Sequence, residues 1–472
     1  MYSPQSAARG PRTILALPAA LLFAAACATY APRPLDPART AAEFRARRLD
    51  DPALVAFAKE VLPAGADFPP TAWDPTHLTL VALHENRELA AARARHAAAL
   101  AGVELADVPP NPTLGLDSEY TANTGVLPWA LGFTFELPIE TGGKRAARVE
   151  VARREAELAR VDVEAAAWNV RSNVRTAFVR FAAAMGEDAL ARAELALHAR
   201  RCALLEARVQ AGEEERGALV RAEAARARAA AERTTIAGRI ATARTELARA
   251  CDLPASALDG IELAWPGFDA PPRADGLDVE AERALVNRAE LRRGLAEYAV
   301  AEARLQLEVA RQYPDLALGP GFQWDRGDHK WRLALSVPLP LFDTHATAIT
   351  EADAARTARA AEFEALETRV LGDVELARQA LARAWDELEA ARAAEATLTR
   401  VVENERVARD AGALDALAGI DAELERAHAR RDAWNALVGV QSALGSLSDA
   451  LATPLERSPT DAASKESPGR NP

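Results

Sequence analysis

The sequence is poor in the residues that build disulfide scaffolds, soft-metal sites and aromatic cores. Its 472 positions include three cysteines, two methionines and only 5% aromatic residues. Cys27, Cys202 and Cys251 are too few and too scattered for a disulfide framework or for a zinc site, which needs clustered ligands. Two methionines provide no thioether ladder for Cu(I), and the seven histidines include no close pair at metal-ligand spacing. We therefore expect no bound metal and no other non-covalent cofactor.

Excess positive charge is also missing, and so are the common catalytic motifs. The net charge of −12 argues against nucleic acid as a partner, because neutralising phosphates requires a basic surface. There is no His-Glu-x-x-His and no Gly-x-Ser-x-Gly. The segment Gly142-Gly143-Lys144-Arg145 lacks the first glycine and the Ser/Thr of a phosphate loop. The sequence predicts neither a nucleic-acid-binding protein nor an enzyme.

A long uncharged apolar run occurs only near the N-terminus. Arg9 and Arg12 precede an apolar segment at 14–26, which has the length of a signal-peptide core and is too short for a convincing membrane-spanning helix. Small residues directly before Cys27 resemble a bacterial lipobox. We expect a signal peptide at 1–26 and a covalent lipid on Cys27, which directs the chain to the outer membrane. The alternative is plain signal cleavage beside an incidental cysteine.

What the chain does have is very long helical patterning. No proline occurs from Thr141 to Val209, and Ala, Leu and Val recur there at helical spacing. A helix of that length would extend for roughly 100 Å, which no compact globule accommodates. Gln210-Ala211-Gly212 interrupts it, and a second helix is expected from about 213 to 250. This pattern predicts a long helical hairpin with its tip at Gly212.

Two strand-like segments precede the long helix. Residues 129–137 alternate strictly between apolar side chains and small or polar ones, as expected for a strand with one apolar face. Aromatic residues near the strand ends suggest an interfacial girdle in a membrane; they are Tyr120, Trp129, Trp324 and Trp331. The opposite faces are expected to carry the carboxylates of Asp117, Glu119, Glu136 and Asp315.

The whole pattern occurs twice. Pro112 and Pro314 lie 202 positions apart, Pro138 and Pro340 also lie 202 apart, and Gly212 and Gly412 lie 200 apart. This internal repeat is the strongest architectural signal in the sequence. It predicts a lipidated N-terminal arm (27–75), a first repeat (76–253), a linker (254–274), a second repeat (275–452) and a disordered tail (453–472). The expected strands lie near 113–121, 129–138, 315–324 and 331–338.

The motifs resemble those of the outer membrane efflux protein family, over about 76–451. They are Asn111-Pro112-Thr113-Leu114, Thr141-Gly142-Gly143-Lys144-Arg145, Tyr313-Pro314-Asp315-Leu316 and Val337-Pro338-Leu339-Pro340-Leu341-Phe342-Asp343. The last and the Gly-Gly-Lys-Arg segment are most similar to the cobalt–zinc–cadmium and copper–silver efflux branch. The chain departs from that branch where Thr344 and His345 follow Asp343.

The resemblance implies a TolC-like fold, mainly α with a small membrane β-barrel. Each protomer would hold duplicated long-helix hairpins and two β-hairpins, and a homotrimer would form a twelve-stranded barrel in the outer-membrane lipid above a periplasmic α-helical barrel. It also implies a periplasmic adaptor protein and an inner-membrane RND pump as partners. Four strands cannot close a membrane barrel alone, whereas three chains supply twelve.

The resemblance further implies functional positions at the helical tips. Candidate residues of the periplasmic gate are Asp415, Asp421, Glu213, Glu214 and Glu215, with a solvated helix start as the alternative for the three glutamates. Candidate adaptor contacts are Gly212, Arg216, Gly412 and Leu417. The expected function is the outer-membrane channel of a tripartite efflux system, with heavy-metal cations as substrates. The alternatives are a multidrug efflux or type I secretion channel and a lipid-anchored periplasmic coiled-coil scaffold.

Overall fold

The computed structural model describes residues 30–63, 67–122, 128–273, 288–325, 327–411 and 415–455. The chain divides into two units, Met1–Ala46 and Arg47–Pro472. Within the first unit, α2 (Pro37–Ala46) is a short helix without a buried residue. The expected arm at 27–75 therefore does not behave as one segment, because its second half belongs to the larger unit. There Leu54 of α3 (Pro52–Val61) and Trp73 of β1 (Ala72–Trp73) are buried in a hydrophobic core.

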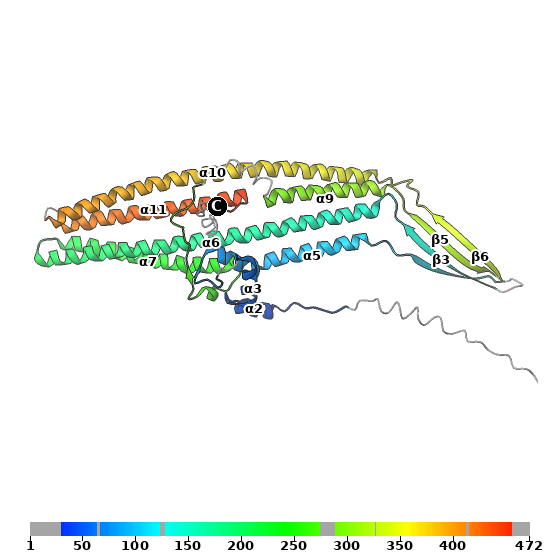
Figure 1. Ribbon diagram of the computed structural model, residues 1–472, viewed down its shortest axis with the longest axis horizontal. Helices are drawn as coiled ribbons and strands as arrows, with labels where there is room; N and C mark the ends of the chain where they lie inside the picture. Colours follow the sequence, from blue (N-terminus) through cyan, green and yellow to red (C-terminus); the bar gives the residue numbers. More distant parts are fainter. Residues whose placement is uncertain are drawn as a thin grey trace, which may run out of the picture. The chain divides into compact units, whose positions relative to one another are not determined.

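Long helices dominate the second unit (Figure 1). The two longest, α6 and α10, have 68 and 65 residues. The helices are α4 (Pro75–Glu85), α5 (Arg87–Asp107), α6 (Lys144–Ala211), α7 (Arg216–Ala250), α9 (Ala289–Arg311), α10 (Ala346–Asp410) and α11 (Ala416–Leu451). Among the described residues, none of these helices combines the length and apolar character needed to cross a membrane.

Side-chain caps explain where the helices before the sheet begin. Asp74 accepts a hydrogen bond from the backbone N–H of His77 (2.8 Å) at the start of α4, and Asn86 accepts one from that of Leu89 (2.8 Å) at the start of α5. Such caps satisfy donors that the first helical turn leaves unpaired. The chain therefore stops and restarts at Asn86 rather than running on as a single helix.

A four-stranded antiparallel sheet lies at one end of the long helices (Figure 1). Its strand order is β2-β3-β5-β6. The strands are β2 (Thr113–Tyr120), β3 (Trp129–Ile139), β5 (Leu316–Asp325) and β6 (Asp328–Ser336). Strand β6 begins earlier than expected, because a tight turn at Gly327 (φ 105°) lets Asp325 and Asp328 pair directly. The pairing of β3 with β5 joins the two repeats, and β2 and β6 form the outer edges.

The duplication is visible in the packing as well as in the order of elements. The buried residues of α10 in the range 370–388 each lie 200 positions after a buried residue of α6; they are Val370, Val374, Ala377, Leu381, Ala384 and Leu388. Near the ends of the short helices, Leu247 and Leu447 repeat the same spacing. The predicted mainly α fold of duplicated helical hairpins with two β-hairpins is confirmed.

Two hydrophobic cores meet through the segment between the repeats. One core gathers α3, α4, α6 and α7, and the other gathers α10 and α11. Aromatic rings with centroids 5.4 to 6.2 Å apart connect them in the order Phe181, Phe178, Trp265, Phe268, Trp434. Within the same segment, β4 (Glu262–Leu263) pairs in parallel with β1. The region expected to be a linker (254–274) is therefore, through its described part, a packed element.

Candidate functional site

One face of the sheet is mainly apolar. The register places the odd residues of β3 and β6 beside the even residues of β2 and β5, so that Leu116, Phe133, Phe322 and Trp331 lie in one row across the sheet. Most of these side chains are exposed, with Trp331 at 82% and Leu116 at 78% of their full accessibility. An apolar surface of this extent marks a contact with lipid or protein.

The four candidate girdle residues lie on this same face, toward the hairpin turns. Tyr120 and Trp129 are cross-strand neighbours with ring centroids 5.0 Å apart. Trp324 pairs with Leu131 in the next row, and the ring of Trp331 lies 5.0 Å from that of Phe322. The structure thus places on one face of the sheet four aromatic side chains that lie up to 211 positions apart (331 − 120) in the sequence. Asp117, Glu119 and Glu136 lie on the opposite face, as the alternation predicts.

Asp315 was expected on that polar face, and this prediction is wrong. Its Oδ1 accepts hydrogen bonds from Nζ of Lys144 (2.6 Å) and from the backbone N–H of Thr141 (2.9 Å). Asp315 directly precedes β5 of the second repeat, and Lys144 is the first residue of α6 of the first repeat. Their contact therefore holds the start of a strand against the start of a helix from the other repeat. The sequence could not place it, because the partners lie 171 positions apart.

Gly142 completes this junction between helices and sheet. It has φ +64°, and a Cβ there would lie 2.8 Å from the carbonyl oxygen of Ala310 and from a ring carbon of Tyr313. Thr141 donates its hydroxyl to the carbonyl oxygen of Pro314 (2.6 Å). Both the left-handed backbone and the close approach require glycine. The Thr-Gly-Gly-Lys and Tyr-Pro-Asp segments are therefore two sides of a single contact.

At the opposite ends of the helices, both candidate gate aspartates form ion pairs with α6. Arg208 donates two hydrogen bonds to Asp415, one of them 2.9 Å long, and this interaction holds the pKa of the Asp415 carboxyl below its ordinary value. Arg201 lies 3.2 Å from Asp421 in the same seam between α6 and α11. These carboxylates tie one hairpin to the other within the chain. The two arginines were missed, although their spacing of seven residues places them on one helical face.

The other tip candidates have different surroundings. Gly212 ends α6 with φ +74°, and Glu213, Glu214 and Glu215 form the loop to α7. Glu215 occupies the cap position, but its side chain makes no capping hydrogen bond. Arg216 is exposed, whereas Leu417 packs against a small cluster of Cys202, Leu205 and Ala222. Gly412 lies outside the described residues, as does the lipidation candidate Cys27.

A comparison with known protein families agrees with this architecture. Residues 79–251, which run from within α4 to the end of α7, match the family described as outer membrane efflux protein. The first repeat is thus similar to the outer membrane efflux protein family. The second repeat carries the same series of helix, two strands and two long helices from α9 to α11.

Two relatives have names that refer to metal resistance. The chain is 28% identical over 264 residues to the cobalt-zinc-cadmium resistance protein CzcC of Cupriavidus metallidurans, a match covering 54% of this chain and 61% of that protein. It is 28% identical over 229 residues to the nickel-cobalt-cadmium resistance protein NccC of Alcaligenes xylosoxydans xylosoxydans, covering 47% of this chain and 49% of that protein. The matches thus span 61% and 49% of the lengths of these relatives.

The fold is also that of a solved outer-membrane protein. VceC of Vibrio cholerae superposes with a TM-score of 0.65 at 20% identity, and the match covers 81% of this chain and 97% of that one. At this identity the likeness establishes the architecture alone.

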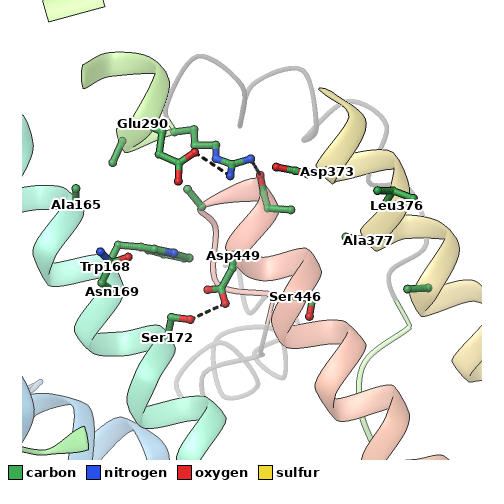
Figure 2. A pocket seen from close by; sticks show the side chains of 15 residues that line it. Ala165, Trp168, Asn169, Ser172, Glu290, Asp373, Leu376, Ala377, Ser446 and Asp449 are labelled. Atoms are coloured by element: carbon green, nitrogen blue, oxygen red, sulfur yellow. Dashed lines mark hydrogen bonds and ion pairs between the residues drawn. The ribbon is translucent and has the colours of Figure 1, made fainter. Parts of the chain in front are cut away.

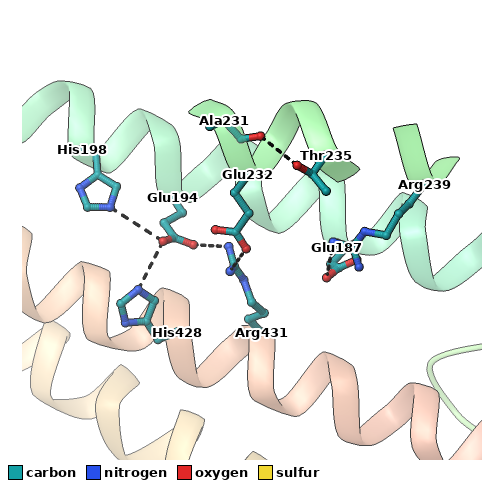
Figure 3. A network of polar contacts seen from close by, with 9 residues as sticks. All are labelled: Glu187, Glu194, His198, Ala231, Glu232, Thr235, Arg239, His428 and Arg431. Atoms are coloured by element: carbon teal, nitrogen blue, oxygen red, sulfur yellow. Dashed lines mark hydrogen bonds and ion pairs between the residues drawn. The ribbon is translucent and has the colours of Figure 1, made fainter. Parts of the chain in front are cut away.

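A polar network that the sequence did not predict joins three helices behind the tips (Figure 3). The buried carboxylate of Glu194 on α6 pairs with Arg431 of α11 and lies 3.3 Å from Nε2 of His428. Arg431 also binds Glu232 of α7 (2.7 Å). Burial lowers the pKa of His198, which lies 3.8 Å from Glu194. Within the described ranges, no group of three His, Cys, Asp or Glu side chains could hold a metal ion. The network's contacts link α6, α7 and α11.

A cavity of about 640 Å³ lies between α6, α10 and α11 (Figure 2). The side chains of Trp168, Asn169 and Ser172 on α6 form one wall, and Ser172 donates to Oδ2 of Asp449 on α11 (2.5 Å). A second cavity, of about 510 Å³, lies at the equivalent place in the first repeat, lined by residues of α6 and α7 that include Arg180 and Glu246.

Replacing Arg208 with alanine is expected to loosen the start of α11 while leaving the thermal midpoint unchanged. The Arg208–Asp415 pair is partly exposed, and exposed ion pairs contribute little to global stability. Hydrogen exchange of the amides at 416–420 should accelerate. The matched control is Arg226→Ala, which removes an exposed arginine of α7 that has no ion pair among the described residues. Unchanged exchange in Arg208→Ala would contradict the tie.

The same difference should depend on pH with a defined sign. Because the folded-state pKa of Asp415 lies below its ordinary value of 3.8, the pair is intact above pH 3.8 and is lost as the pH falls through the lowered pKa. The difference in amide hydrogen-exchange rate between wild type and Arg208→Ala is therefore expected to stay constant down to pH 3.8. It should shrink as the pH falls further, through the lowered pKa of Asp415.

Proposed function

We propose that this protein is the outer-membrane channel of a tripartite efflux system and that it conducts heavy-metal cations from the periplasm to the exterior. The observation that carries the proposal is the exposed apolar face of the sheet, held at one end of the duplicated helical hairpins. In water this face would be an aggregation hazard. In lipid it would be buried, with its aromatic residues near one boundary of the bilayer.

The open edges of the sheet support a homotrimer. In lipid the unpaired backbone groups of β2 and β6 would be costly, and closure into a barrel removes such edges. Four strands per chain and three chains give twelve, which is enough for a closed barrel with an open lumen. A covalent lipid on Cys27 would add a second attachment to the same membrane.

The helical tips suggest how the conduit meets its partners. Asp415 and Asp421 are the candidate gate residues, and the glutamates at 213–215 add negative charge that would attract cations and repel anions. A periplasmic adaptor would contact the exposed tip around Gly212 and Arg216, and an inner-membrane pump would deliver the cargo. The names of the relatives CzcC and NccC favour cobalt, zinc, nickel or cadmium as that cargo.

The test is conductance followed by resistance. Purified protein in a planar bilayer should produce discrete, cation-selective conductance steps, and deletion of the gene should sensitise its host to cobalt, zinc or cadmium. Sensitivity to drugs instead of metals would favour a multidrug channel, and loss of a secreted protein would favour type I secretion. A protein that neither enters bilayers nor fractionates with the outer membrane would leave the lipid-anchored scaffold as the better assignment.

A further inference from the structure

One carboxylate in the seam between α6 and α11 is shared by three side chains. Glu194 has a side chain that is 9% exposed, and it pairs with Arg431 of α11. Nε2 of His428 on α11 lies 3.3 Å from its Oε1, and Nε2 of His198 on α6 lies 3.8 Å from the same oxygen. Figure 3 shows the two imidazoles approaching this carboxylate from different helices. Two groups of the kind that titrates near neutral pH therefore meet at one largely buried anion.

The two imidazoles differ in their access to water. The side chain of His428 is 61% exposed, so water can solvate its ring in either protonation state. That of His198 is 13% exposed, and its Nδ1 atom is buried without a hydrogen-bond partner among the described residues. A neutral His198 ring whose Nε2–H points to Glu194 leaves only a lone pair unpaired at Nδ1. A protonated ring would bury an N–H donor with no acceptor, which is costly in a protein interior.

Positive charge near His198 opposes its protonation as well. Arg201 lies further along α6, toward the tip, and its repulsion of a charged ring adds to the effect of burial. His428 of α11 acts in the same direction. Asp421 of α11 lies 3.2 Å from Arg201 and holds that guanidinium in the seam. With burial as the largest cause, the pKa of His198 lies below its ordinary value of 6.5.

The attraction of Glu194 for a proton on His198 is limited by another partner of the carboxylate. Arg431 pairs with Glu194 and also binds Glu232 of α7, 2.7 Å away. The carboxylate is therefore already balanced by a guanidinium that contacts a third helix. A charged His198 would compete with Arg431 for this carboxylate, and that competition weakens the contact between α6 and α11.

We propose that His198 is an acid-sensitive latch: its neutral ring keeps α11 packed against α6 behind the tip, and its protonation loosens that packing. The ring lies 14 positions (212 − 198) before Gly212, or about 21 Å along the helix. The ion pairs nearer the tip join arginine to aspartate, and these residue types ordinarily keep their charges between about pH 5 and 8. The latch therefore gives the seam a response to acid that those pairs lack. It concerns regulation of the proposed conduit, and only its effect on conductance rests on that function.

The duplication indicates that packing alone does not require an imidazole here. At a spacing of 200 positions, His198 corresponds to Leu398 of α10 and Glu194 to Ala394. Apolar side chains thus occupy the equivalent place in the second long helix. The histidine adds what leucine lacks, a charge that changes with pH.

The direction of the pH dependence follows from the two states of the seam. In the loosened seam the His198 ring meets water and takes up a proton near its ordinary pKa of 6.5, whereas in the packed seam it stays neutral to a lower pH. Above pH 6.5 both states hold a neutral ring, and the packing has its full strength. As the pH falls from 6.5 to the lowered pKa, only the loosened state gains the proton, so the packing weakens. One proton changes the ratio of the two states by at most about tenfold per pH unit.

Amide hydrogen exchange in the full-length, detergent-solubilised protein tests the latch. Wild type, His198→Gln and His428→Gln are compared from about pH 8 to about pH 5, with rates corrected for the intrinsic pH dependence of exchange. Glutamine keeps an N–H near Glu194 but carries no charge at any of these pH values. His428→Gln is the matched control, because it removes the exposed imidazole from the same carboxylate. Amides at 150–160 of α6, remote from the network, are the internal reference.

The expected result is a rise in the open fraction of the wild-type amides at 190–202 and 424–435 as the pH falls below 6.5. The rise should persist in His428→Gln and disappear in His198→Gln. Should His198→Gln fail to fold, His198→Leu introduces the residue of the duplicate position and should be equally insensitive to pH. A wild type without the rise, or a rise that survives the loss of His198, would overturn the inference.

Conductance in a planar bilayer is recorded separately. The open probability is expected to increase in acid for wild type and to stay constant for His198→Gln. A protein that shows the exchange response but never conducts would contradict the proposed function and leave the latch intact.

Discussion

Leu333→Lys is expected to abolish assembly in the outer membrane, whereas Ala334→Lys, one residue away, is expected to leave it intact. Leu333 lies in the middle of β6 on the apolar face and is 72% exposed. A lysine facing lipid near the bilayer midplane costs about 2–4 kcal/mol. Each subunit of a trimer would carry that cost, so the assembled fraction should fall steeply.

The control, Ala334→Lys, places the same side chain in the same strand, so the two variants differ mainly in the face of the sheet that carries the lysine. Ala334 is also exposed but lies on the opposite face, beside Gly319. The same lysine there would line the lumen, where water can solvate it. The measurement is the amount of each variant in the outer-membrane fraction and its oligomeric state after detergent extraction. Equal tolerance of both lysines would contradict the lipid-facing assignment, because a sheet in water would not distinguish them.

The sequence was sufficient for these architectural conclusions because they depend on periodicity. Alternation in β3 fixed its apolar face, and the absence of proline across α6 fixed a helix of exceptional length. The recurrence of Pro112 as Pro314 and of Pro138 as Pro340 disclosed the duplication. Each of these signals is local or repeats at a constant spacing, so one chain without its relatives was enough.

The contacts that position the candidate functional side chains could not be predicted from periodicity. Asp315 lies on a strand-like pattern and was assigned to the polar face, yet Lys144 and the backbone of Thr141 hold it at the junction. Asp415 was predicted as a gate candidate, and its hydrogen bonds with Arg208 of another helix were not foreseen. Such pairings depend on the relative rotation and shift of packed helices, which periodicity leaves undetermined.

The electrostatics of the tips follow from the same packing. Two ion pairs, Arg208–Asp415 and Arg201–Asp421, hold the second hairpin against α6. Further back, Arg431 connects Glu194 and Glu232 across three helices. The counterparts of Glu194 and Arg431 at a spacing of 200 are Ala394 and Ala231. This network therefore has no equivalent at the corresponding positions of the duplicated helices.

Gly186→Ala should destabilise the protein, although alanine is the better helix former by about 1 kcal/mol. Gly186 lies inside α6, and a Cβ there would fall 2.0 Å from Cζ2 of Trp434 on α11. The indole cannot yield easily, because its Nε1–H donates to the carbonyl oxygen of Ala183 (3.1 Å) and its ring packs on Phe268. Overpacking of this kind costs about 1–3 kcal/mol, so the clash outweighs the propensity gain.

Two further variants decide whether the clash is the cause. Gly238→Ala introduces the same methyl group into α7 where nothing lies within 4 Å, so it should raise the thermal midpoint through helix propensity alone. Trp434→Leu removes the obstructing ring, and Gly186→Ala added to that variant should become neutral or stabilising. The resulting coupling between positions 186 and 434 is expected at about 1–3 kcal/mol. Additive effects would mean that Gly186 serves the bending of α6 and not its contact with α11. The row of aromatic rings from Phe181 to Trp434 would then have no role in fixing how the two hairpins lie together.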